Sequence, residues 1–208
     1  MDNKLERRFF PVSLRATGEG EKRVIEGYAA VFNSLSVVLY GMFRERIAQG
    51  AFASSLGDDI RALWNHNTDF PLGRTKNNTL RLAEDDAGLK VAIEPPATQL
   101  ARDFLTSIER GDVDQMSFAF NALDETWDEM EDGTIVRTLL KVRLFEVSPV
   151  TFPAYPATSV GVRSGLGTDY IPTIPDRLLR ARQTKQQGTD EAAQARLRSR
   201  RRLLQLME

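Results

Sequence analysis

Three side chains in this sequence could together carry out acyl-transfer chemistry. His66 is the single histidine of the chain, and an imidazole can take up and release protons near neutral pH. Ser117 could act as a nucleophile, and Glu146 could hold the imidazole in the orientation that catalysis needs. Such triads occur in different chain orders on unrelated folds, so the order His, Ser, Glu is compatible with one.

The composition excludes several other kinds of chemistry. The chain of 208 residues has no cysteine, which removes disulfides, thiolate metal sites and cysteine nucleophiles. With one histidine, a zinc site would need mostly carboxylate ligands, so we expect no metal site. Neither a Gly-x-Ser-x-Gly elbow nor a Ser-x-x-Lys motif surrounds Ser117, which argues against an α/β-hydrolase or a β-lactamase-type enzyme.

Each candidate residue also has an ordinary structural explanation. We expect a strand over 59–66, in which His66 shares a face with Trp64 and lies at a polar strand end. Ser117 lies between large apolar residues of another strand, on a shallow strip that could admit a substrate backbone or simply be a small core position. Glu146 lies in an apolar strand, where a carboxylate is usually turned to solvent. The residues alone leave these alternatives open.

Alternating apolar and polar residues, bounded by turn residues, predict many short strands. We expect strands over 8–16, 23–32, 42–47, 59–66, 79–83, 88–93, 115–121, 134–142, 143–150 and 159–162. One helix is expected over 98–110, where apolar residues recur at helical spacing and Gly111 follows. The pattern predicts a β-rich α+β domain, in which a barrel or a closed sandwich would cover the strand edges.

The end of the chain differs in charge from the rest. Residues 176–208 carry nine basic and four acidic side chains, a net charge of +5, so the preceding residues carry −6 of the overall −1. The Gly- and Pro-containing stretch over 164–175 is typical of a flexible linker. We therefore divide the chain into a body over 1–163, this linker and a basic helical tail. Such a tail suits docking on an acidic partner, or it is a solvated helix.

Six short blocks follow one another along the body. They are IEGYAAVFN (25–33), FRERIAQGAF (43–52), LWNHN (63–67), PLGR (71–74), QMSFAF (115–120) and FEVSPVTFPAYP (145–156). With this series the chain resembles the prohead (capsid maturation) proteases of tailed bacteriophages, a serine protease family distantly related to herpesvirus assemblin. The resemblance covers about residues 8–163.

The resemblance implies a role for each candidate residue. His66 would be the general base, Ser117 the nucleophile and Glu146 the third member, in the place where the herpesvirus relatives use a second histidine. For the oxyanion hole we predict the backbone N–H groups of Ala154 and Tyr155. The implied fold is a herpesvirus-protease-like β-barrel surrounded by helices, and no cofactor is expected.

The resemblance also implies a substrate and a place of action. The substrate would be the scaffolding region of the major capsid protein, or a separate scaffold, inside an assembling prohead in the host cytoplasm. The family tends to cut itself, so the linker and the tail are candidate targets of self-cleavage. Herpesvirus relatives act as dimers, which leaves a homodimer open. The N-terminus lacks an apolar signal core and no apolar stretch could span a membrane, so we expect no membrane association.

Two alternatives come from other functional classes. The chain could be a non-catalytic capsid assembly scaffold or chaperone that keeps the protease fold. It could also be a nucleic-acid-binding module with a basic tail, which we rank last because the body is acidic and the basic run over 196–202 is short.

Overall fold

The computed structural model describes residues 4–10, 14–18, 23–151 and 170–184, together with 187, 191 and 194. Within these residues the strands form two sheets, with the strand orders β1-β9-β10-β5-β6 and β2-β3-β8-β7, and β4 pairs with β10. The larger sheet contains β1 (Glu6–Phe10), β4 (Arg44–Ile47), β5 (Arg61–Trp64), β6 (Asn67–Arg74), β9 (Gln115–Glu129) and β10 (Ile135–Val150). The smaller sheet contains β2 (Arg15–Thr17), β3 (Val24–Val31), β7 (Leu80–Glu84) and β8 (Gly88–Ile93).

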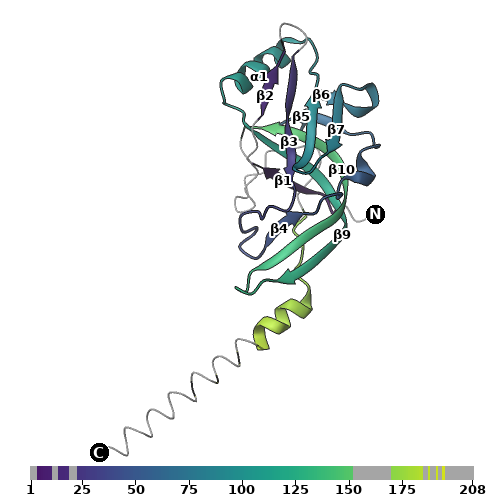
Figure 1. The fold of residues 1–208 in the computed structure, drawn as a ribbon. Helices are drawn as coiled ribbons and strands as arrows, with labels where there is room; N and C mark the ends of the chain where they lie inside the picture. Colours follow the sequence, from purple (N-terminus) through teal and green to yellow (C-terminus); the bar gives the residue numbers. More distant parts are fainter. Residues whose placement is uncertain are drawn as a thin grey trace, which may run out of the picture.

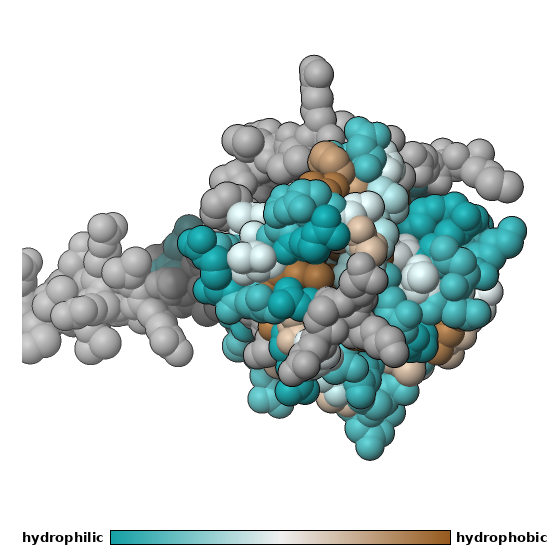
Figure 2. Space-filling model, turned by 90° about the horizontal axis from the view of Figure 1, so that it is seen from above, coloured by the Kyte–Doolittle hydropathy of each residue, from teal (hydrophilic) through white to brown (hydrophobic). Residues whose placement is uncertain are grey.

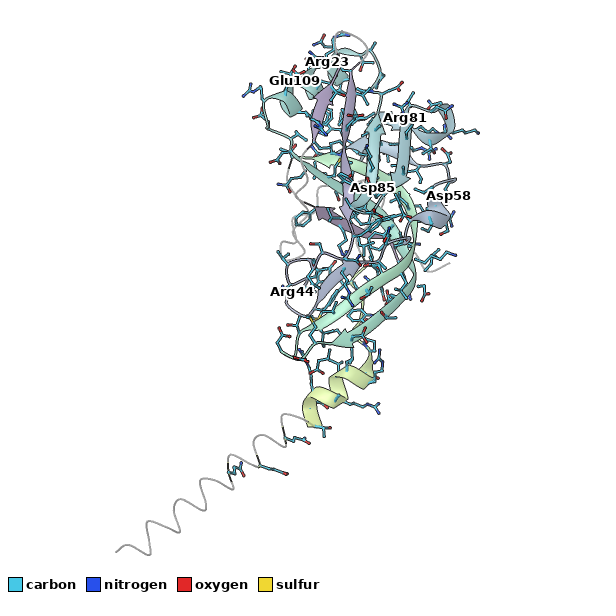
Figure 3. All side chains as sticks on the ribbon, in the orientation of Figure 1. Arg23, Arg44, Asp58, Arg81, Asp85 and Glu109 are labelled. Atoms are coloured by element: carbon cyan, nitrogen blue, oxygen red, sulfur yellow. The ribbon has the colours of Figure 1, made fainter. Side chains whose placement is uncertain are left out.

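The helices lie at the two ends of the molecule (Figure 1). Helix α1 (Gln99–Glu109) confirms the predicted helix, and Thr98 caps it by accepting a hydrogen bond from the backbone N–H of Ala101 at 3.3 Å. An ion pair of 3.0 Å joins its last residue, Glu109, to Arg23 at the start of β3 (Figure 3). The other helix covers residues 176–184. Two short 3₁₀-helices are η1 (Ala53–Ser55) and η2 (Thr75–Asn77).

The long antiparallel pair of β9 and β10 forms the centre of the larger sheet. We predicted two strands where the structure has the single 16-residue strand β10. Register shifts between Leu139 and Lys141, Lys141 and Val142, and Leu144 and Glu146 interrupt the ladder. Such bulges bend a strand and disturb its side-chain alternation, which is why one curved strand has the sequence pattern of two.

The alternation of side chains on β9 is confirmed. Met116, Phe118 and Phe120 are completely buried in the main hydrophobic cluster. The rings of Phe52 and Phe118 meet edge to face, with 5.4 Å between their centroids. Ser117 is thereby directed to the opposite face of the strand.

The β-rich α+β class is confirmed, but the described residues form no closed barrel. The larger sheet ends at β1 on one side and at β6 on the other, and the smaller sheet is a separate ladder. Strand β6 contains Pro71, which has no N–H to donate and therefore suits an edge strand. In the described part of the chain the two α-helices do not surround the sheets, since they lie at opposite ends (Figure 1).

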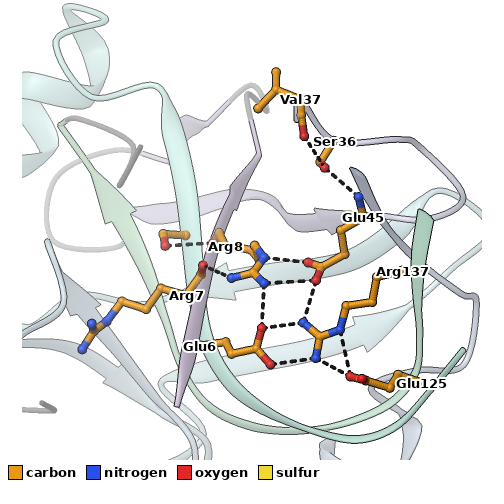
Figure 4. A network of polar contacts seen from close by, with 9 residues as sticks. Glu6, Arg7, Arg8, Ser36, Val37, Glu45, Glu125 and Arg137 are labelled. Carbon is orange, nitrogen blue, oxygen red and sulfur yellow. Dashed lines mark hydrogen bonds and ion pairs between the residues drawn. The ribbon is translucent and has the colours of Figure 1, made fainter. Parts of the chain in front are cut away.

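Five buried or half-buried charged side chains join four strands of the larger sheet (Figure 4). Arg8 donates to Glu45 at 2.6 Å and to Glu6 at 2.6 Å. Arg137 donates to Glu6 at 2.5 Å, to Glu45 at 2.8 Å and to Glu125 at 2.8 Å. Burial lowers the pKa of Arg8, but Glu45 and Glu6 outweigh burial and raise it above its usual value. The network fixes β1 against β4, β9 and β10.

A second hydrophobic cluster attaches the helix over 176–184 to the body. Ile174 and Leu178 are buried in it beside Trp127 of β9, and Arg177 donates to the backbone carbonyl of Trp127 at 2.6 Å. The backbone N–H of Tyr170 donates to the carbonyl of Leu5 at 2.7 Å. The proposed domain boundaries stay a prediction, and the strand expected over 159–162, most of the linker and the end of the tail lie outside the described residues.

The described surface is mainly polar on the face shown in Figure 2, where apolar residues are scattered among hydrophilic ones. Among the described residues, no helix is both long enough and apolar enough to span a bilayer.

Candidate active site

The structure brings His66 and Glu146 into direct contact. Their side chains meet at 2.5 Å between Nδ1 and Oε1, and both residues are buried, with exposed fractions of 8% and 2%. Glu146 lies in β10 where this strand pairs in parallel with β5. His66 follows the end of β5 by two residues and therefore lies close to the carboxylate. An ionised carboxylate can only accept, so an ionised Glu146 requires the hydrogen of this bond to be on Nδ1.

His66 occupies a turn and not the strand that we predicted. Strand β5 ends at Trp64, and both Asn65 and His66 have left-handed backbones, with φ of 52° and 57°. The backbone N–H of Asn65 donates to the carbonyl of Pro149 at 3.1 Å, and its side-chain oxygen accepts from the N–H of Thr151 at 2.9 Å. Strand alternation with Trp64 therefore does not apply to His66. Asn65 and His66 form the two-residue turn between the antiparallel strands β5 and β6, for which positive φ at both residues is the usual geometry, and these bonds join the turn to the end of β10.

Ser117 lies on the same face of the β9–β10 pair as Glu146. In the antiparallel register Ser117 is opposite Ser148, and Ala119 is opposite Glu146. Directly opposite residues project to the same face of a sheet. Ser117 is completely buried, and its hydroxyl donates to the backbone carbonyl of Arg8 in β1 at 2.8 Å.

The hydroxyl of Ser117 is thus bonded to β1 in this structure and not to the imidazole. The second ring nitrogen of His66, Nε2, is buried without a hydrogen-bond partner in the part of the chain described here. Since Nδ1 faces Glu146, Nε2 is the nitrogen left to accept a proton. Catalytic hydrogen bonds are often long or absent before substrate binds, so this arrangement is compatible with a serine–histidine pair.

Sequence reasoning missed a fourth polar residue at this site. The hydroxyl of Ser148 donates to the second carboxylate oxygen of Glu146, Oε2, at 2.5 Å, and it accepts from the backbone N–H of His66 at 3.2 Å. Ser148 follows Glu146 by two residues, so the strand period of two already places both on one face. That spacing is the signal that could have found it.

The predicted oxyanion residues Ala154 and Tyr155 lie outside the described residues. Across the ranges that the structure covers, no group of three or more metal-ligating side chains is found.

Comparison with known proteins gives the site its context. A family described as caudovirus prohead serine protease matches residues 10–168, which is most of the chain. The chain belongs to this family. It is also similar to the prohead protease of Enterobacteria phage HK97, with 30% identity over 173 residues, which cover 81% of this chain and 71% of that protein. No solved structure gives a significant match. Membership of the prohead serine proteases indicates a serine protease with a role in phage capsid maturation.

Proposed function

We propose that this protein is a serine endopeptidase in which Ser117 is the nucleophile, His66 the general base and Glu146 the residue that orients it. The contact of 2.5 Å between His66 Nδ1 and Glu146 Oε1, on the face of the sheet that carries Ser117, is the observation that carries the proposal. Family membership supports the reaction class.

In the proposed mechanism the hydroxyl of Ser117 turns from the carbonyl of Arg8 toward Nε2 of His66. Its oxygen attacks the peptide carbonyl while Nε2 takes the proton, which gives a tetrahedral intermediate. The peptide C–N bond then breaks, Nε2 returns the proton to the leaving amine, and an acyl-enzyme remains. Water, activated by the same nitrogen, hydrolyses the ester. Glu146 stays ionised and stabilises the imidazolium that forms in each half-reaction.

Backbone N–H groups must stabilise the oxyanion of this intermediate. We propose Ala154 and Tyr155, which follow β10 and the site by only a few residues in sequence. This assignment rests on their place in the sequence.

We propose scaffolding segments of the capsid subunit as substrates, together with the chain's own residues over 164–208. The action would take place in the assembling prohead within the host cytoplasm. A homodimer stays a prediction, as does the absence of nucleic-acid binding. Support for the substrate class comes from the family and from the name of the HK97 relative, which is a prohead protease.

The test compares the intact mass over time of the full chain and of Ser117→Ala, each alone and with the cognate capsid subunit. Ser55→Ala is the matched control, because Ser55 is an equally buried serine whose hydroxyl bonds to Val142 and Leu144 of β10, outside the site. We expect cleavage by the wild type and by Ser55→Ala and none by Ser117→Ala. Equal cleavage in all three would remove Ser117 from the mechanism. Intact chains and an intact capsid subunit throughout would favour a non-catalytic scaffold.

A further inference from the structure

We infer that Ser148 is a positioning residue of the triad, which fixes the carboxylate of Glu146 and the turn of His66 with one hydroxyl group. This inference deepens the proposed function and rests on it.

The hydroxyl of Ser148 makes one donated and one accepted hydrogen bond, and both are within the site. A serine hydroxyl has one hydrogen to donate and two lone pairs to accept with. The hydrogen is donated to Oε2 of Glu146 at 2.5 Å, and one lone pair accepts the backbone N–H of His66 at 3.2 Å. Ser148 has no exposed surface, so water cannot readily replace either bond.

The bond to His66 matters because it joins the turn to the strand that carries Glu146. Asn65 and His66, both with left-handed φ, form the two-residue turn between β5 and β6, and contacts with the end of β10 fix the position of this turn. Pro149, Thr151 and Ser148 of the β10 end supply these contacts. Ser148 alone among the three also bonds to the carboxylate that faces the imidazole ring.

The bond to Glu146 matters because a buried carboxylate needs a partner for each oxygen. The backbone of Glu146 is held on both sides, since it pairs with Ala119 of β9 and with Arg61 of β5. With Oε1 on His66 and Oε2 on Ser148, both carboxylate oxygens have fixed partners. Ser148 is also directly opposite Ser117 in the register, so its hydroxyl joins the backbone of His66 and the carboxylate of Glu146 to the strand pair that carries the proposed nucleophile.

Ser148 is not itself placed as the nucleophile. Its hydrogen is committed to a carboxylate, and its oxygen accepts from a backbone amide, while Nε2 of His66 has no bond to it. Its expected effect on the reaction therefore passes through His66 and Glu146. Loss of the hydroxyl should lower the rate of cleavage by about 100-fold, the order expected when a catalytic group is misplaced by about 1 Å.

The first experiment reads the histidine directly by NMR. Because His66 is the single histidine, ¹⁵N labelling of the ring gives signals that need no assignment, and the two nitrogen shifts show which nitrogen carries the hydrogen. We would record the full chain as Ser117→Ala, which blocks self-cleavage, with and without Ser148→Ala. Ser55→Ala is again the control, because that buried serine makes one donated and one accepted bond to the same strand.

We expect the neutral imidazole to carry its hydrogen on Nδ1 in the parent and in the Ser55→Ala protein. Ser148→Ala should lower the fraction of imidazole with its hydrogen on Nδ1, because the carboxylate of Glu146 and the backbone of His66 lose the hydroxyl to which both are bonded. An unchanged population, with the same loss of thermal stability as Ser55→Ala, would show that Ser148 is only structural and would overturn the inference. If Ser148→Ala does not fold, Ser148→Thr keeps the hydroxyl and should keep the Nδ1 hydrogen. A folded Ser148→Thr protein without that hydrogen would also overturn the inference.

The second experiment measures cleavage rates by intact mass with Ser117 present. Ser148→Ala should be slower by about 100-fold and Ser55→Ala unchanged. The two proposals fail in different ways. Cleavage by Ser117→Ala would refute the proposed function and leave the NMR result on Ser148 standing, whereas an unchanged imidazole and rate in Ser148→Ala would refute only its positioning role.

Discussion

At the scale of single residues, the site keeps a carboxylate where folded proteins rarely tolerate one. Glu146 is 2% exposed, and a buried charge is unfavourable unless it is paired and hydrogen-bonded. Here the protein satisfies each oxygen with a different partner, the imidazole of His66 and the hydroxyl of Ser148. An acceptor held in this way can both orient the ring and stabilise its charged form.

We predict that Glu146→Gln leaves the fold intact and lowers the cleavage rate by about 10⁴-fold. The amide has nearly the same shape, but its NH₂ group can donate to Nδ1 and so favour the imidazole form with its hydrogen on Nε2, which cannot accept a proton from Ser117. The rate of self-cleavage followed by intact mass checks this. Glu94→Gln, at an exposed carboxylate paired with Arg81, is the control and should cleave normally. A Glu146→Gln rate within tenfold of wild type would contradict the role of this carboxylate.

Among the strands, the buried charged network connects β1 to β4, β9 and β10 of the larger sheet. Glu6 and Arg8 belong to β1, Glu45 to β4 and Arg137 to β10. Each of the two arginines bonds to both Glu6 and Glu45. The backbone carbonyl of Arg8 in turn accepts the hydroxyl of Ser117. Strand β1 is thus held in a defined place against the strand that carries the proposed nucleophile.

We expect Arg137→Met to lower the free energy of unfolding by about 3–5 kcal/mol, because it leaves buried carboxylates without their cation. Its side chain is 1% exposed. The matched control is Arg81→Met at an exposed ion pair with Glu94, where the loss should be about 0–1 kcal/mol. Urea unfolding of both variants measures the difference. Equal midpoints for the two variants would show that the network contributes little to stability.

At the scale of the whole molecule, surface carboxylates make the fold sensitive to acid. A hydrogen bond from Arg74 holds the pKa of Asp59 at about 2, below its ordinary value. A hydrogen bond from the hydroxyl of Tyr28 lowers the pKa of Asp85, and one from the backbone N–H of Thr134 lowers that of Asp132. Each group has a lower pKa in the folded state than in the unfolded chain. Its contribution to stability is therefore present above about pH 4 and is lost as the pH falls toward the folded-state value.

We predict that Asp59→Asn lowers the melting temperature at pH 7 and that this difference from wild type disappears as the pH falls from about 4 to about 2. The mutation removes the ionised partner of Arg74, which wild type itself loses on protonation. Thermal unfolding by circular dichroism across this range provides the measurement. Asp69→Asn, at an exposed aspartate in β6, serves as the control. A difference that persists unchanged at pH 2 would argue against the ion pair as its source.

The chemistry available to this protein and most of its elements can be predicted from neighbouring residues in the chain. Strand alternation in 115–120 separates Ser117 from the aromatic core, and the apolar spacing before Gly111 predicts helix α1, because these signals depend on neighbours in the chain. The blocks around His66, Ser117 and Glu146 also indicated the family that the comparison then showed.

The contacts between these residues follow from the folded arrangement of the strands. His66 leaves the predicted strand because it lies in the two-residue turn between β5 and β6, and this turn is bonded to Pro149 and Thr151, more than 80 residues away in the chain. The barrel expected from the resemblance is replaced by two open sheets in the described residues. The contact of His66 with Glu146, like the bond of Ser117 to Arg8, joins residues far apart in sequence. Local propensity has no information on such contacts, which depend on register and sheet order.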